Sequence, residues 1–201
     1  MGNKGYVTFA LEYNFKYLIS FAVGHLEAGK SSNQERIETL RQILERKINN
    51  KQSHNKFKNS DYWLILGDLN FRIETSFDSS FRMIQNKEYR DLIRYDQFYV
   101  YCKREKDLAL AKEGEINFSP TYKYVPGSNN YINDSDNIRI SSYTDRILFC
   151  NKIGITNISY NSIPTVIYSD HRPVQGCYEV YVFENGYNNN NNMNICKFKL
   201  E

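Results

Sequence analysis

The sequence of 201 residues has few of the residues that build zinc sites and disulfide frameworks. Its four cysteines include no Cys-x-x-Cys pair and it has only three histidines, so neither kind of site is expected. Free thiols instead suggest a reducing, cytoplasmic compartment. No apolar run reaches the about 20 residues that cross a bilayer, and the first residues do not resemble a signal peptide. The net charge of +3 permits an anionic partner without demanding one.

The composition is that of one globular domain rich in strands. Apolar residues make up 41% of the chain, enough for a core, and the 15% of aromatic residues favours strands over a helical bundle. The β-rich segments 6–12 and 16–23 predict a hairpin. An apolar stripe predicts a helix over 32–48, and one or two helices are expected in 77–96. The continuous apolar run 62–66 is typical of a strand that is buried on both faces.

The second half of the chain has further strand-like segments and a polar tail. We expect strands near residues 145–150, 154–160, 163–168 and 176–183. The tail, 185–201, contains an uninterrupted run of asparagines that cannot bury apolar surface. Disorder is therefore predicted for this tail.

Asp68 and Asn70 follow directly after the apolar run 62–66. Two residues apart on an extended chain, their side chains point the same way. A carboxylate can take the proton of an attacking water while an amide fixes the orientation of that water. The sequence Gly-Asp-x-Asn is equally good turn chemistry. The motif by itself therefore leaves both a catalytic pair and a simple turn open.

Asp145, Asp170 and His171 also stand beside strand-like segments. Asp170 suits a hard cation such as Mg²⁺, which prefers oxygen donors. His171 can donate to a phosphoryl oxygen, and Asp145 can orient an imidazole and keep it protonated. The alternatives are a structural histidine and an ion pair between Asp145 and Arg146 that ends the strand.

Further candidates carry positive or hydrogen-bonding side chains. His25 ends a strand and is either a proton donor or phosphate ligand, or a residue packed beside the next helix. Lys123 and Arg139 flank a polar loop and suggest recognition of additional phosphates, although each alone is typical of a solvated surface. Asn3 and Lys4, in a turn between glycines, more weakly suggest the same recognition of phosphates. The convergence of five separate segments favours one site over coincidence.

Two of these segments resemble the signature motifs of a known family. Gly-Asp-Leu-Asn-Phe-Arg-Ile at 67–73 and Tyr-Thr-Asp-Arg-Ile-Leu at 143–148 are similar to those of inositol polyphosphate 5-phosphatases. The family's other blocks are matched in the same order by residues 2–5, 24–29, 118–124 and 169–174. Apurinic endonucleases and pancreatic deoxyribonuclease share the Asp-x-Asn and Ser-Asp-His elements but lack the Pro-Thr-Tyr-Lys block.

The resemblance implies an α/β fold, a four-layer αββα sandwich of two mixed sheets like that of deoxyribonuclease. Residues 1–184 would be the C-terminal part of such a domain, with the N-terminal strands missing. It also implies Mg²⁺-dependent removal of the 5-phosphate from phosphoinositides or soluble inositol phosphates. We therefore expect such a substrate as partner, peripheral contact with a membrane and no nucleic acid.

The resemblance also implies a role for each catalytic candidate. Asp68 would be the base that activates water, with Asn70 beside it. His171 would stabilise the pentavalent phosphorus centre, and Asp145 would orient His171. His25 would help to bind the scissile phosphate.

The same resemblance implies a metal ligand and a phosphate subsite. Asp170 would lie at the Mg²⁺ ion. Tyr122, Lys123 and Arg139 would grip the 4-phosphate of the inositol ring. The chain has Asn137 where the family usually has a lysine, which we expect to weaken that grip.

Other departures concern two neutral residues and the missing strands. Ser141 and Thr144 stand where the family usually has proline and cysteine. The upstream strands with an asparagine and a metal-binding glutamate have no counterpart, so we expect these 201 residues alone to be weakly active or inactive. Two alternatives stay open: a non-catalytic domain that binds phosphoinositide or a partner, and a superfamily nuclease.

Overall fold

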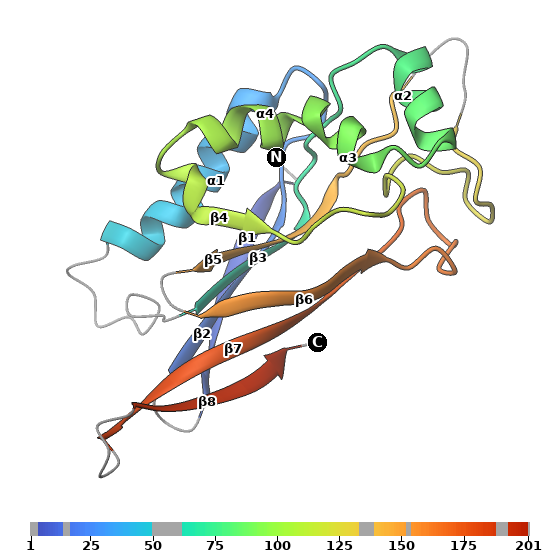
Figure 1. Ribbon diagram of the computed structural model, residues 1–201. Coiled ribbons are helices and arrows are strands. Elements are labelled where there is room, and N and C mark those ends of the chain that lie inside the picture. The colour runs from blue at the N-terminus through green and yellow to red at the C-terminus, as the bar shows by residue number, and fades with distance from the viewer. Residues whose placement is uncertain are drawn as a thin grey trace.

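Two sheets and a layer of helices make up the fold (Figure 1). The computed structural model describes residues 4–13, 17–49, 62–132, 139–151, 154–187 and 193–200. The strands are β1 (Gly5–Tyr13), β2 (Tyr17–His25), β3 (Tyr62–Asp68), β4 (Ala111–Glu113), β5 (Asp145–Asn151), β6 (Ile155–Ser162), β7 (Val174–Tyr187) and β8 (Met193–Leu200). The helices are α1 (Asn33–Asn49), α2 (Phe77–Gln85), α3 (Tyr89–Leu92) and α4 (Gln97–Tyr101), with short 3-10 turns η2 (Ile93–Tyr95), η3 (Cys102–Arg104) and η4 (Leu108–Leu110).

The strands form one sheet of five and one of three. The order of the first is β1-β2-β3-β5-β4, in which β2 and β3 run parallel and the other pairs antiparallel. The second, β6-β7-β8, is antiparallel. The predicted α/β class with two sheets is confirmed. Within the described residues the helices lie over the five-stranded sheet, and none covers the outer face of β6-β7-β8 (Figure 1).

Strand β3 contributes to two of the three apolar clusters of the described residues. Its alternate residues Trp63 and Ile65 belong to the core between the first sheet and the helices. Tyr62 and Leu64 belong to the core between the two sheets. All four are buried, as the continuous apolar run predicted.

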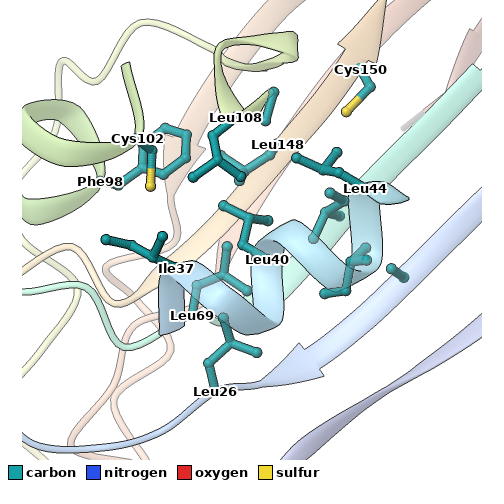
Figure 2. Packing of buried hydrophobic residues seen from close by; sticks show 14 of the residues in the cluster. Leu26, Ile37, Leu40, Leu44, Leu69, Phe98, Cys102, Leu108, Leu148 and Cys150 are labelled. Atoms are coloured by element: carbon teal, nitrogen blue, oxygen red, sulfur yellow. The ribbon is translucent and has the colours of Figure 1, made fainter. Parts of the chain in front are cut away.

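The stripe on α1 closes the helix side of the core. Ile37, Leu40 and Leu44 are buried. Figure 2 shows them in one cluster with Leu148 and Cys150 of β5, with Ile37 on the side of Phe98 and Cys102. The spacing of three and four residues puts these side chains on one face of the helix. The predicted hairpin, the helix and the buried strand are thus all found.

Two expectations for the second half of the chain are wrong. Residues 163–168 form a turn, in which Ile163 C=O accepts from Val166 N–H at 3.2 Å, because Pro164 has no N–H to donate to a sheet. The tail is also more ordered than predicted, since β8 pairs antiparallel with β7. Apolar and basic residues alternate from Cys196 to Leu200, which favours a strand. Residues 188–192, with the asparagine run, lie outside the described residues.

Strand β1 is one edge of the five-stranded sheet among the described residues, and β4 is the other. Val7, Phe9 and Leu11 lie on one of its faces beside Val23 of β2, and all four are exposed, Val7 by 67%. Phe9 stacks on Phe21 with ring centroids 4.9 Å apart. This apolar face is therefore open to solvent among the described residues. Among the described residues, none of the helices has the length and apolar character of a membrane span.

We expect Gly67→Ala to lower the free energy of unfolding by about 3 kcal/mol, because left-handed backbone strain and a backbone clash add together. Gly67 has φ +130°, and a Cβ there would lie 2.0 Å from the carbonyl oxygen of Gly24. Gly24→Ala is the matched control, since its Cβ would meet nothing nearer than 3.5 Å. Urea unfolding of both variants measures the difference. Equal stability of the two would contradict this reading of the β2–β3 contact.

Candidate active site

The pairing of three strands puts His25, Asp68 and Asp145 in one row across the sheet. Because β2 and β3 are parallel, their last residues, His25 and Asp68, are direct neighbours. Because β5 is antiparallel to β3, its first residue, Asp145, stands opposite Asp68. His25 Nε2 lies 3.1 Å from Asp68 Oδ2. Residues distant in sequence thus meet at one edge.

His171 joins this row from the loop between β6 and β7. Its Nδ1 lies 3.0 Å and 3.2 Å from the two carboxylate oxygens of Asp145. Burial alone lowers the pKa of the imidazole, but the hydrogen bond to Asp145 and its charge outweigh burial, so the pKa of His171 is raised. The ring therefore keeps its proton to higher pH than an exposed histidine does.

Asp68 faces a second carboxylate across a short gap. The pKa of the Asp68 carboxyl is raised, mainly by burial and secondly by the negative charge of Asp145. A half-buried carboxyl group beside another carboxylate ionises less readily. Single ligand atoms from Asp68, Asp145 and His171 all lie within 4.8 Å of one another. The cluster can therefore accept a proton or contribute ligands to a cation.

Asn70 is held rigidly just beyond β3. Its φ is +58°, a left-handed conformation that asparagine tolerates, so the chain is not extended here as the sequence suggested. Its backbone N–H donates to Asp68 Oδ1 at 3.1 Å, and its Nδ2 donates to Leu26 C=O at 3.0 Å. Arg72 donates to its Oδ1 and, through Nε at 3.1 Å, to its backbone oxygen. The motif is both a turn and part of the cleft wall.

A cleft of about 500 Å³ opens over this row. Its wall carries four cationic side chains, those of Lys4, Lys30, Arg72 and Arg139. The remaining lining residues are His25, Ala28, Gly29, Asp68, Asn70, Ile73, Tyr122, Ile140, Ser142, Asp170 and His171. Acidic groups at the floor and cations around them suit a phosphorylated ligand.

The outer candidates fall into two groups. Arg139 Nη1 donates to the Tyr122 hydroxyl at 3.0 Å, and both line the cleft. Lys4 Nζ contacts His25 Nε2. Lys123 is not among the residues lining the cleft; its Nζ lies 4.0 Å from Asp170 Oδ2.

Asp170 lines the cleft but stands apart from the cluster of ligand atoms. Its Oδ1 accepts from the Ser169 hydroxyl at 3.2 Å. Asn3 and Asn137 lie outside the described residues.

Sequence reasoning missed three contributors. Arg72 lies over the Tyr122 ring, 4.7 Å from its centroid, and its position two residues after Asn70 was the available signal. The hydroxyls of Thr121 and Thr144 donate to Asp145 Oδ2 at 2.7 Å and 2.9 Å. No sequence pattern predicts these contacts. The one from Thr121 joins segments 24 residues apart, and the one from Thr144 depends on the rotamer of its side chain.

The match to protein-family models extends over most of the chain. Residues 1–177 match the family described as Endonuclease/Exonuclease/phosphatase family 2. The chain belongs to this family. The matched range includes every residue of the row and of the cleft wall.

Curated relatives of this endonuclease/exonuclease/phosphatase chain include proteins named as inositol 5-phosphatases. Synaptojanin-2 of Rattus norvegicus is 32% identical over 210 residues, which cover 91% of this chain and 14% of the relative. Inositol-1,4,5-trisphosphate 5-phosphatase 1 of Schizosaccharomyces pombe is 33% identical over 90% of this chain and 16% of its own length. The chain therefore spans less than a fifth of these relatives.

Solved structures with the same fold include one with a bound ligand. The inositol polyphosphate 5-phosphatase domain of SpSynaptojanin, in complex with inositol (1,4)-bisphosphate and calcium ion, matches with a TM-score of 0.77 and 32% identity. That match covers 89% of this chain and 51% of the domain. A Cimex nitrophorin matches with a TM-score of 0.64 at 24% identity, over 86% of this chain and 58% of the nitrophorin, and shows the fold alone.

We expect Asn70→Asp to lower the free energy of unfolding by about 2 kcal/mol, because a buried acceptor would replace the donor to Leu26 C=O beside Asp68. Asn70 is 2% exposed. Asn161→Asp, on an exposed position of β6, is the matched control and should change stability by less than about 0.5 kcal/mol. Thermal unfolding compares the two. A similar small effect at both sites would mean that the amide of Asn70 is not locked.

Proposed function

We propose that this chain carries the catalytic residues of a phosphomonoesterase that removes the 5-phosphate from phosphoinositides or soluble inositol polyphosphates. The observation that carries the proposal is the row of His25, Asp68 and Asp145, extended by His171 and open to a cation-lined cleft. The 5-phosphatase relatives support the substrate class.

In the proposed reaction Asp68 accepts a proton from the attacking water. Its raised pKa, caused first by burial, suits a general base. Asn70, fixed by Leu26 C=O and Arg72, offers a rigid wall that orients the water. Pre-set geometry of this kind lowers the entropic cost of reaching the transition state.

His171 faces the developing negative charge on the phosphoryl oxygens. The hydrogen bond between Nδ1 and Asp145, with the charge of Asp145, raises the pKa of the His171 ring, and Nε2 is then the donor to the cleft. His25, paired with Asp68, is a second donor to the same phosphate. Preorganised donors in a half-buried site stabilise a charged transition state without reorganisation.

The donor set fits a divalent cation. The carboxylates of Asp68 and Asp145 offer oxygen atoms within 4.8 Å of each other, and oxygen donors are those that Mg²⁺ prefers. Asp170 would hold the ion at the edge of this cluster. When bound, Mg²⁺ neutralises charge on the transferred phosphoryl group.

Recognition of a 4-phosphate is proposed for Tyr122 and Arg139, which are hydrogen bonded and line the cleft. Lys123 would contribute after releasing Asp170, which its Nζ approaches to 4.0 Å. Contact of the cleft rim with a membrane surface is proposed for lipid substrates.

The first test compares Asp68→Asn with the matched surface variant Asp78→Asn. Phosphate release from phosphatidylinositol 4,5-bisphosphate in vesicles with Mg²⁺ should fall about 100-fold or more in Asp68→Asn, since the base is lost. Asp78 is exposed on α2, so its variant should keep the wild-type rate. Protein in excess over substrate allows even slow turnover by these 201 residues to be detected.

Two results would contradict the proposal. One is equal release by wild type and Asp68→Asn. The other is nicking of supercoiled plasmid without phosphate release, which would favour a nuclease. Lipid binding that is unaffected in Asp68→Asn, without any release by wild type, would instead favour a non-catalytic binding domain.

A second test concerns the 4-phosphate. Arg139→Gln should raise KM about 10-fold for inositol 1,4,5-trisphosphate, the effect expected when one charged hydrogen bond is lost. KM for an analogue without the 4-phosphate should stay unchanged. Arg90→Gln is the control, because Arg90 pairs with Glu115 on the surface. A rise in KM for both substrates would show that Arg139 does not read the 4-phosphate.

A further inference from the structure

Residues 121 and 122 run between the two segments that carry the Asp145–His171 pair. Tyr122 bridges Ser142 on one side and His171 on the other. Next to it, the backbone oxygen of Thr121 accepts from Arg172 N–H at 2.8 Å. Thr121 is thus tied by its main chain to the loop that carries His171.

The side chain of Thr121 is tied to Asp145 instead. Its hydroxyl donates to Asp145 Oδ2 at 2.7 Å, and the backbone N–H of Asp145 points at the same hydroxyl oxygen at 3.4 Å. Thr144 adds a second hydroxyl, which donates to Asp145 Oδ2 at 2.9 Å. That hydroxyl lies 3.4 Å from His171 Nδ1. Asp145 Oδ2 therefore accepts hydrogen bonds from the two threonine hydroxyls and from the imidazole of His171.

Both hydroxyls are enclosed, since Thr121 and Thr144 are each 0% exposed. Water cannot replace a lost donor there without opening the site, and an unpartnered buried oxygen is costly. The carboxylate of Asp145 therefore has one favoured orientation, in which it faces Nδ1 of His171. Which ring nitrogen carries the proton is set by the hydrogen bond of the other.

We propose that Thr121, together with Thr144, is a positioning residue that fixes the Asp145 carboxylate and, through it, the ring of His171. Removal of the Thr121 hydroxyl allows the Asp145 carboxylate to rotate. The hydrogen bond from His171 Nδ1–H to Asp145 then lengthens, and His171 Nε2 no longer points into the cleft. The inference deepens the proposed function, and only its kinetic consequence rests on that function.

The substitutions separate the hydroxyl from the packing. Thr121→Val keeps the branched shape and removes the hydroxyl, whereas Thr121→Ser keeps the hydroxyl and removes a methyl group. Thr144→Val and Thr144→Ser repeat the comparison at the second position. They replace the Thr121 variants as the test if Thr121→Val does not fold. Ser80→Ala is the control for loss of a buried hydroxyl away from the cleft, since Ser80 donates to Phe77 C=O on α2.

The first measurement is the NMR signal of the proton on His171 Nδ1, at one fixed pH and without metal. The chain has only three histidines, so His171→Gln assigns the signal by its disappearance. A strong Nδ1–H hydrogen bond to carboxylate gives a far-downfield signal. We expect this signal to move upfield or to be lost in Thr121→Val, to return in Thr121→Ser and to be unchanged in Ser80→Ala.

The second measurement is the kinetics of phosphate release. Thr121→Val should lower kcat about 10-fold with little change in KM, as removal of a residue that orients a reacting group does. An unchanged Nδ1–H signal in folded Thr121→Val, or a signal that Thr121→Ser does not restore, overturns the proposal. A signal that responds as expected in a protein without phosphatase activity supports the positioning role and contradicts the proposed function alone.

Discussion

The register of β3 between β2 and β5 is the constraint on which the site depends. One parallel and one antiparallel neighbour bring the last residues of two strands and the first residue of a third to the same edge. A shift of one residue would turn Asp68 to the other face of the sheet. The close approach of Gly67 to the Gly24 carbonyl restricts that register, since a larger residue does not fit.

Polar contacts then determine what this edge can do. Two carboxylates lie close together, and like charges in a half-buried site are unfavourable unless they are paired. His25 pairs with Asp68, and His171 pairs with Asp145. Hydroxyls and backbone groups supply the remaining hydrogen bonds, so the cluster is ordered before any ligand arrives. The open, cation-lined cleft above it is where an anionic group meets preorganised donors.

The sequence predicted the elements that local pattern determines. The apolar run predicted β3 and the stripe predicted α1. The convergence of polar residues at strand ends, together with the motif resemblance, placed Asp68, Asp145 and His171 in one predicted site. Local pattern failed where other constraints decided the structure. Pro164 turned an expected strand into a turn, and the left-handed conformation of Asn70 replaced an extended one.

Contacts between loops that are distant in the chain could not be predicted from the sequence. The pairing of Lys123 with Asp170 and the hydroxyl of Thr121 on Asp145 depend on how the segments around 122, 145 and 171 cross. Composition and periodicity carry no information on such crossings. The motif resemblance indicated which residues matter but not which of them are held by others.

A crystal structure of this chain with inositol 1,4,5-trisphosphate tests the central claim most directly. We predict that the ligand occupies the cleft with its 5-phosphate within hydrogen-bond distance of His171 and beside Asp68. A ligand bound elsewhere, or a separation of the Asp68 carboxylate from the His171 ring, would contradict the account.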